Sequence, residues 1–174
     1  MTIYLFAGTN GCGKSTVLVD YIRIHNLEGV EYVCQGFHNA NFFSKQHIES
    51  TKIKNFHLYK RNRLLNERKS MIIEHALENT EIIDFLWEAK QAGYRIVSIF
   101  VYTVSPFVNM RRIKQRVSEG GHGVVFYRIA KRYFQALYHF PALEKVSDEL
   151  YVYNNSRKLQ LTKASIDGYW YDID

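Results

Sequence analysis

Residues 8–16 of this chain read Gly8-Thr9-Asn10-Gly11-Cys12-Gly13-Lys14-Ser15-Thr16, and this stretch decides the fold. It fills every fixed position of G-x-x-x-x-G-K-[ST], the pattern of a phosphate-binding loop. The glycines allow the backbone to curl so that its N–H groups point inward at an anion, with the N-terminus of a helix behind them. The pattern therefore predicts that all nine residues form the binding loop for a nucleotide phosphate.

The flanks of this loop support that interpretation. Residues 3–7 are short, apolar and β-prone, as a buried parallel strand should be. Residues 15–23 carry apolar side chains at helical spacing. A chance glycine turn is the alternative, and the order strand, loop, helix argues against it. We expect Lys14 to reach the β- and γ-phosphates and the Ser15 hydroxyl to ligate Mg²⁺.

The composition indicates one domain with a sizeable core. The chain has 174 residues, of which 47% are hydrophobic and 15% aromatic, with only 2 Pro and 10 Gly. No internal repeat is evident, and no apolar run approaches the length of a membrane span. We expect a cytosolic protein without membrane contact, whose cysteines, Cys12 and Cys34, form neither a metal site nor a disulfide.

The net charge of +6 arises from 23 basic and 17 acidic residues. Such a balance suits nucleic-acid binding, but it also suits an enzyme whose substrates are polyphosphates. The distribution favours a local anion site, because a cluster of cations lies close together in the chain: Arg111, Arg112, Lys114, Arg116, Arg128, Lys131 and Arg132.

The chain alternates between predicted strands and helices. We expect strands at residues 3–7, 30–34, 70–74, 94–102 and 150–153. We expect helices at residues 15–23, 56–69, 81–91, 106–118 and 124–140. Residues 155–174 resemble a β-hairpin that turns at 165–168.

Local signals refine these elements. Thr80 is a candidate N-cap and Gly93 a stop for the helix at 81–91. In the helix at 56–69, Leu64 and Leu65 are candidate core contacts and Arg61 is expected to point outward.

Alternating strands and helices predict an α/β protein of the P-loop NTPase fold. We expect a five-stranded, mainly parallel sheet with helices on both faces, a helical lid and a C-terminal β-hairpin. Residues 1–156 would form the kinase-like domain, and residues 157–174 would form an extension packed on the same domain. Ligands in such sheets bind at the carboxyl ends of the strands, which places Gly36, Glu74 and the phosphate loop on one rim.

Several further stretches carry a family resemblance: Ala89–Arg95, Phe100–Thr103 with Pro106, Asn109, Arg112, Arg116-Val117, Gly120-Gly121-His122, Arg132-Tyr133 and Val152–Ser156. Together with the phosphate loop, they resemble the zeta-toxin-like P-loop kinases over roughly residues 1–156. The piece Arg-Val-x-x-Gly-Gly-His and the Asn-Ser ending are more specific than the loop alone.

The resemblance implies ATP–Mg²⁺ as phosphate donor and, as in the characterised toxins, the hydroxyl of a nucleotide sugar as acceptor. It implies that Arg116 and Arg132 clamp the transferring phosphates and that Glu74 contacts the acceptor. Lys14 and Ser15 keep their phosphate and Mg²⁺ roles. Because zeta-type toxins are paired with an antitoxin, an antitoxin protein is a candidate partner.

The chain departs from the family pattern on the acceptor side. Gly36 stands where the family has an aspartate that acts on the acceptor hydroxyl. After Glu74, the family threonine is His75 and the family serine is Glu78. The lid sequence also differs, at residues 121–125.

Each candidate side chain also has a structural interpretation. Without the family, Glu74 could orient a hydroxyl, hold Mg²⁺ through water or be a plain strand-end carboxylate. Structural roles are favoured for the histidines, with His38 and His75 hydrogen-bonded and His122 packing the lid. A solvated helix face is favoured for Arg112 and Arg128. Core packing is favoured for a run of aromatic side chains: Tyr127, Tyr133, Phe134, Tyr138 and Phe140.

The sequence thus predicts an ATP-dependent kinase acting on a small-molecule hydroxyl, with activity weakened at Gly36. One alternative is a nucleotide-binding protein that has lost efficient transfer. Another is a polynucleotide kinase or nucleic-acid-associated ATPase, although nucleic acid is the less favoured partner.

Overall fold

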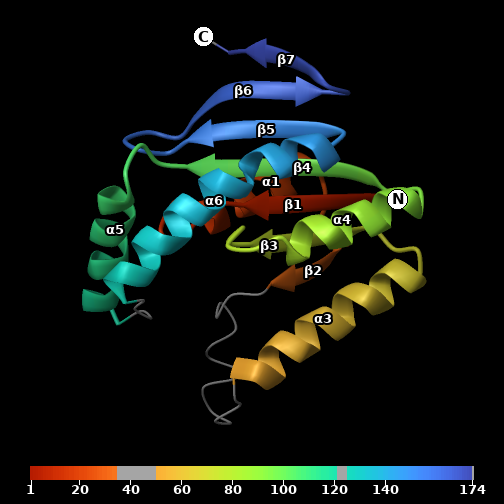
Figure 1. Cartoon of the computed structure of the whole chain (residues 1–174), viewed down its shortest axis with the longest axis horizontal. Coiled ribbons are helices and arrows are strands. Elements are labelled where there is room, and N and C mark those ends of the chain that lie inside the picture. Colours follow the sequence, from red (N-terminus) through yellow and green to blue (C-terminus); the bar gives the residue numbers. More distant parts are fainter. Residues whose placement is uncertain (35–49, 121–124, 174) are drawn as a thin grey trace.

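The computed structural model describes residues 1–34, 50–120 and 125–173, and its centre is one seven-stranded sheet (Figure 1). The strands are β1 (Thr2–Ala7), β2 (Glu31–Cys34), β3 (Met71–His75), β4 (Arg95–Tyr102), β5 (Glu149–Asn154), β6 (Gln160–Ile166) and β7 (Tyr169–Asp172). Their order is β2-β3-β1-β4-β5-β6-β7. The first five run parallel, and β6 and β7 are antiparallel additions at one edge.

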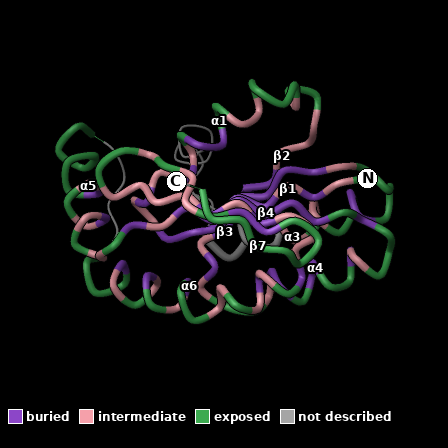
Figure 2. Tube along the Cα trace, turned by 90° about the horizontal axis from the view of Figure 1, so that it is seen from above, coloured by how far each residue is buried: buried purple, intermediate pink, exposed green. Residues whose placement is uncertain are grey.

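Helices cover both faces of this sheet. They are α1 (Lys14–Ile24), α3 (Ser50–Asn66), α4 (Glu81–Gln91), α5 (Pro106–Ser118) and α6 (Phe126–Val146). Helix α1 lies on one face, α4 and α6 lie on the other, and α5 stands beyond the ends of the strands (Figures 1 and 2). Within the described residues, no helix combines the length and apolar character needed to cross a membrane.

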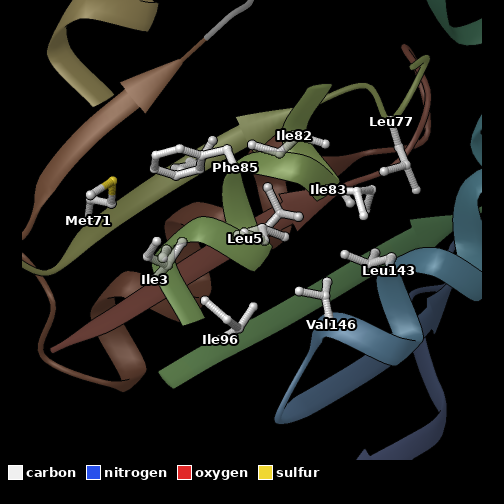
Figure 3. Packing of buried hydrophobic residues seen from close by; sticks show 14 of the residues in the cluster. Ile3, Leu5, Met71, Leu77, Ile82, Ile83, Phe85, Ile96, Leu143 and Val146 are labelled. Atoms are coloured by element: carbon white, nitrogen blue, oxygen red, sulfur yellow. The ribbon is translucent and has the colours of Figure 1, made fainter. Parts of the chain in front are cut away.

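Two apolar layers hold the sheet between its helices. Alternate side chains of β1, such as Ile3 and Leu5, pack with α4 and α6 residues such as Phe85 and Leu143 (Figure 3). The intervening side chain Phe6 packs in a second cluster, on the side of α1. Strands buried on both faces explain the nearly continuous apolar runs of the sequence.

The predicted fold class is confirmed, and the sheet is larger than five strands because the C-terminal hairpin joins it. Asp167 and Gly168 form the turn between β6 and β7, and both have positive φ values, 50° and 86°. Such a two-residue turn matches the twist of the strands that it joins. Strand β6 then pairs with β5, so the hairpin continues the sheet.

Thr80 is the N-cap residue of α4, as predicted, but its side chain makes no cap hydrogen bond; instead Asn79 Oδ1 accepts from the Glu81 N–H at 3.3 Å. The prediction for Arg61 was wrong. Arg61 does not point outward, because its guanidinium lies 4.1 Å from the Phe85 ring centroid and 3.8 Å from Glu81 Oε1. An aromatic face and a carboxylate on α4 together hold this cation inward.

Helix α6 also runs further than predicted. The expected end was Phe140, since the next residue is Pro141, yet the helix continues to Val146. Leu143 and Val146 are both fully buried in the core beyond the proline. Their burial favours continuation over the loss of one backbone hydrogen bond at Pro141.

Candidate functional site

The parallel register brings the phosphate loop and Glu74 together. Phe6 of β1 lies opposite Glu74 of β3, and the loop begins two residues after Phe6. Strand β4 flanks β1 on its other side, so the carboxyl ends of β3, β1 and β4 meet at one edge. This edge is where ligands bind in open parallel sheets.

The glycines of the loop are required by conformation and by space. Gly8, Gly11 and Gly13 have φ values of 137°, 82° and 101°, which L side chains rarely adopt. A Cβ at Gly8 would lie 2.1 Å from the Val101 oxygen, and one at Gly13 would lie 2.2 Å from Asn155 Nδ2. The loop is therefore pressed against β4 and the end of β5, and its curl needs glycine.

A chain of buried polar side chains fixes the start of the loop. Asn109 of α5 donates through Nδ2 to Thr9 Oγ1 at 3.1 Å and accepts through Oδ1 from Thr103 Oγ1 at 2.8 Å. Tyr133 of α6 donates to the Thr103 carbonyl at 2.7 Å. Thr9, Thr103 and Asn109 are almost fully buried, so these bonds tie the loop to the ends of β4, α5 and α6.

Two further side chains fix the middle of the loop through one carbonyl. Asn155, directly after β5, donates to the Cys12 oxygen at 2.8 Å, and Arg112 Nη1 lies 3.5 Å from the same oxygen. Cys12 and Cys34 are free thiols, as predicted. Burial raises the pKa of the Cys12 thiol, so it stays neutral and serves as a small packing group.

Lys14, Ser15 and Glu74 form the charged centre of the site. Ser15 Oγ donates to Glu74 Oε1 at 3.3 Å, and Lys14 Nζ lies 4.0 Å from the same oxygen. Lys14 Nζ also donates to the Thr9 carbonyl at 3.1 Å. The Tyr32 hydroxyl donates to Glu74 Oε2 at 2.8 Å. Burial and the Glu74 charge raise the pKa of Tyr32, so its phenol remains a donor.

The donor set of this centre fits Mg²⁺ and phosphate. A hydroxyl and a carboxylate are the hard oxygen ligands that Mg²⁺ prefers, and Mg²⁺ usually keeps waters and takes substrate phosphates as further ligands. Within the described residues, no group of three or more His, Cys, Asp or Glu side chains could hold a metal. The Ser15 hydroxyl and the Glu74 carboxylate are thus a donor set of the kind that suits a Mg²⁺ ion whose other ligands are waters and phosphates.

The two predicted arginines lie on helices α5 and α6. Arg116 is exposed on α5. Arg132 of α6 forms an ion pair through Nε with Glu78 Oε2. That pair borders an open hollow of about 390 Å³, lined by Glu78, Asn79, Tyr127, Arg128, Lys131, Arg132 and Gln135. Their role in clamping phosphates stays a prediction.

The histidine predictions fall partly inside and partly outside the described residues. Gly36, His38, Gly121 and His122 lie outside the described residues. His75 is buried, and its Nδ1 accepts from the Leu77 N–H at 2.9 Å. The structural interpretation of His75 is thus confirmed.

Sequence reasoning assigned no loop-supporting role to the side chains that hold the loop, although several of them carry the family resemblance. Arg112 was expected on a solvated helix face, and this was wrong, since it is half-buried against the loop. Tyr32 was not singled out, and Thr103 was named only for the family resemblance, without a role. The available signal was position: Thr103 and Asn155 each follow a predicted parallel strand, where polar side chains gather at one edge.

Comparisons with known proteins agree with the fold. No family model matches the chain. An uncharacterised protein of Haemophilus influenzae is 27% identical over 135 residues, covering 74% of this chain and 89% of that protein. A chain of the AvrRxo1-ORF1:AvrRxo1-ORF2 crystal structure with sulphate ions superposes with a TM-score of 0.69 at 13% identity, over 98% of this chain. The same complex was also solved with ATP.

Two other solved structures share this architecture. One belongs to the PezAT toxin–antitoxin system of Streptococcus pneumoniae, with a TM-score of 0.57 at 14% identity, over 91% of this chain and 70% of that chain. The other belongs to the Pnkp1/Rnl/Hen1 RNA repair complex, with a TM-score of 0.63 at 17% identity, over 80% of this chain and 45% of that chain. The chain spans 60% of the AvrRxo1 chain that it matches. These likenesses, all at 17% identity or lower, support the predicted P-loop α/β fold.

Proposed function

We propose that this protein is an ATP-dependent phosphotransferase of the zeta-toxin-like kind, acting on the hydroxyl of a small molecule such as a nucleotide sugar. One observation carries the proposal. The Glu74 carboxylate is hydrogen-bonded to Ser15 and lies 4.0 Å from Lys14, at the edge where the phosphate loop begins. A bare phosphate loop would bind an anion, but a loop with this carboxylate has a donor set for a metal–nucleotide complex.

The loop residues would hold the donor nucleotide. The first N–H groups of α1 have no partners within the helix and carry its positive dipole end, so residues 8–16 would bind the phosphates through the backbone. Lys14 would leave the Thr9 carbonyl and Glu74 to contact the β- and γ-phosphates. Ser15 would contribute its hydroxyl to Mg²⁺.

Glu74 would act on the donor side of the reaction. Its hydrogen bonds to Ser15 and Tyr32 hold both carboxylate oxygens beside the loop. We therefore assign it to the metal–nucleotide complex, which is one of the roles that its strand-end position allowed. Contact with the acceptor, which the family resemblance implies, would then be a secondary role of Glu74.

Phosphoryl transfer depends on positioning and charge stabilisation more than on covalent chemistry. Bound Mg²⁺ would neutralise charge that develops on the transferring phosphoryl group. Arg116 and Arg132 would add to that stabilisation if the lid brings them to the phosphates, and such an arginine is worth about 10³–10⁵ in rate in related systems. The solved AvrRxo1 and PezAT structures come from two-protein systems, which supports an antitoxin-like partner here.

Isothermal titration calorimetry with ATP and Mg²⁺ tests the donor site. We expect wild type to bind and Lys14→Ala to lose most of the affinity, while Lys114→Ala, a matched exposed lysine on α5, binds as wild type does. Transfer of labelled phosphate to a panel of nucleotide sugars and amino sugars tests the reaction. If wild type binds no nucleotide at millimolar concentration, the proposal is wrong.

A nucleotide-binding protein without efficient transfer is the second candidate. The observation that favours it is Gly36, since the family carries an aspartate at that position. Tight ATP–Mg²⁺ binding together with no transfer to any acceptor would support this candidate. Transfer that rises in Gly36→Asp would support the kinase.

A further inference from the structure

Helix α6 has exposed positions on the side away from the sheet (Figure 2), and several of its aromatic residues are exposed. Tyr127, Phe134 and Tyr138 are 65%, 62% and 81% exposed. The prediction that they belong to the core was wrong for these three, although Tyr133 is buried and Phe140 packs against the core. Exposure of three large aromatic side chains on one helix calls for a binding explanation.

Helical geometry places these three rings on one line. Their separations of seven and four residues correspond to nearly whole turns at 3.6 residues per turn. Lys131 lies between Tyr127 and Phe134 on the same stripe and is exposed. We call Tyr127, Lys131, Phe134 and Tyr138 the outer stripe of α6.

The surroundings of the outer stripe are basic. Its first turns border the hollow that also contains Arg128, whose Nε lies 3.5 Å from the Tyr127 hydroxyl. The one carboxylate lining that hollow, Glu78, is paired with Arg132. Further along the helix, Glu144 is turned to Trp170 and accepts from its indole N–H at 2.8 Å. The stripe itself carries no acidic side chain.

We propose that the outer stripe of α6 binds single-stranded nucleic acid. Aromatic rings that stack on bases, interleaved with cations that contact phosphates, are the two components of such sites. Tyr127 and Tyr138 are about 16 Å apart along the axis at 1.5 Å per residue, which provides three stacking positions for a short stretch of strand. This activity goes beyond the proposed kinase reaction and does not require it.

The chemistry of the stripe favours a nucleic acid over a protein ligand. A protein-docking face is typically one contiguous apolar patch. Here Lys131 separates two of the rings, and the neighbouring Arg128 adds charge of the same sign. The net charge of +6 gives the whole chain the same electrostatic preference for a polyanion.

Fluorescence anisotropy with labelled 12-nucleotide oligo(dT) and oligo(U) tests the proposal. We expect wild type to bind at low salt, and Phe134→Ala and Tyr138→Ala each to weaken binding about tenfold. Tyr169→Ala, an equally exposed tyrosine on β7, is the control and should bind as wild type does. Lys131→Ala should lower the slope of log K against log salt by about 0.7, because one phosphate contact is lost.

Two results would overturn the proposal. One is salt-dependent binding that neither Phe134→Ala nor Tyr138→Ala changes, since this would be charge attraction without stacking. The other is equal affinity for a duplex of the same length, whose bases are not free to stack. Calorimetry of the same variants with ATP and Mg²⁺ keeps this test separate from the kinase proposal, because both rings belong to the exposed outer stripe and we expect ATP affinity not to change.

Discussion

Glu74→Gln is the substitution that best separates the possible roles of the carboxylate. Glutamine keeps the size of the side chain, and its one amide oxygen can accept from Tyr32 or from Ser15, while its amide nitrogen can only donate. It removes the negative charge that lies 4.0 Å from Lys14 Nζ. We expect the variant to bind Mg²⁺-free ATP more tightly than wild type and to gain much less from added Mg²⁺.

The structure gives the size of this effect. Two unit charges 4.0 Å apart interact by about 4 kcal/mol at an effective dielectric constant of about 20. A polyphosphate in the loop would feel repulsion of similar origin from Glu74. Because solvent and Lys14 screen part of it, we expect a gain of at least tenfold in Mg²⁺-free affinity, or about 1.4 kcal/mol.

The free energy of unfolding of the nucleotide-free protein should fall in Glu74→Gln, although its affinity for Mg²⁺-free ATP should rise. Lys14 is 7% exposed and would lose its carboxylate neighbour. Breaking a buried ion pair costs about 3–5 kcal/mol, and we expect about 2–3 kcal/mol here because the Thr9 carbonyl still accepts from Lys14. Urea unfolding without nucleotide measures this loss.

The assay is calorimetric titration with ATP in EDTA and again in excess Mg²⁺. The measured quantity is the dissociation constant in EDTA divided by the dissociation constant in excess Mg²⁺. This ratio should fall at least tenfold in Glu74→Gln. Tyr32→Phe is the matched control, since it loses one hydrogen bond to Glu74 and keeps the charge. An unchanged ratio in Glu74→Gln, with transfer abolished, would place the carboxylate on the acceptor instead.

Other predictions concern the supports of the site. Asn155→Ala removes the hydrogen bond to the Cys12 carbonyl and should cost about 0.5–1.5 kcal/mol in urea unfolding, with weaker ATP binding; unchanged affinity would show that the loop needs no such support. Burial lowers the pKa of His57, so the unfolded state takes up a proton at a higher pH than the folded state does. The free energy of unfolding should therefore be unaffected by His57 above about pH 6.5 and should decrease as the pH falls below that value. His57→Gln should flatten this decrease in thermal unfolding between pH 7 and 5. Arg132→Gln should slow phosphoryl transfer at least tenfold with little change in ATP affinity, whereas Glu78→Gln should not slow it. If both variants have the same effect in a labelled-phosphate assay, Arg132 acts only through its structural ion pair with Glu78.

The fold was predictable because its signals are local. The phosphate loop fixes a strand before it and a helix after it, and the remaining strands are apolar runs bounded by turn residues. The hairpin turn at Asp167-Gly168 was also visible in the sequence. The pairing of this hairpin with β5 was not, because strand pairing depends on edges that only the assembled sheet provides.

The site was predictable where one motif contains it. Lys14 and Ser15 are fixed positions of the loop pattern, and Glu74 could be placed at the same rim from the end of its strand. The supports could not be foreseen in the same way. Asn109 and Asn155 lie about 100 and 143 positions from their loop partners, so no spacing in the sequence connects them.

Strand geometry separates the two departures from the family pattern that follow Glu74. Successive side chains of a strand point to opposite faces. Glu74 therefore meets Ser15 and Tyr32 near α1, while His75 lines a small cavity on the other face with His57 and Glu81. A substitution at position 75 therefore acts first on the packing around this small cavity. Glu78 differs, because its carboxylate holds Arg132 beside the open hollow. Of these two departures, only Glu78 contacts a side chain that is predicted to act on the transferring phosphates, Arg132.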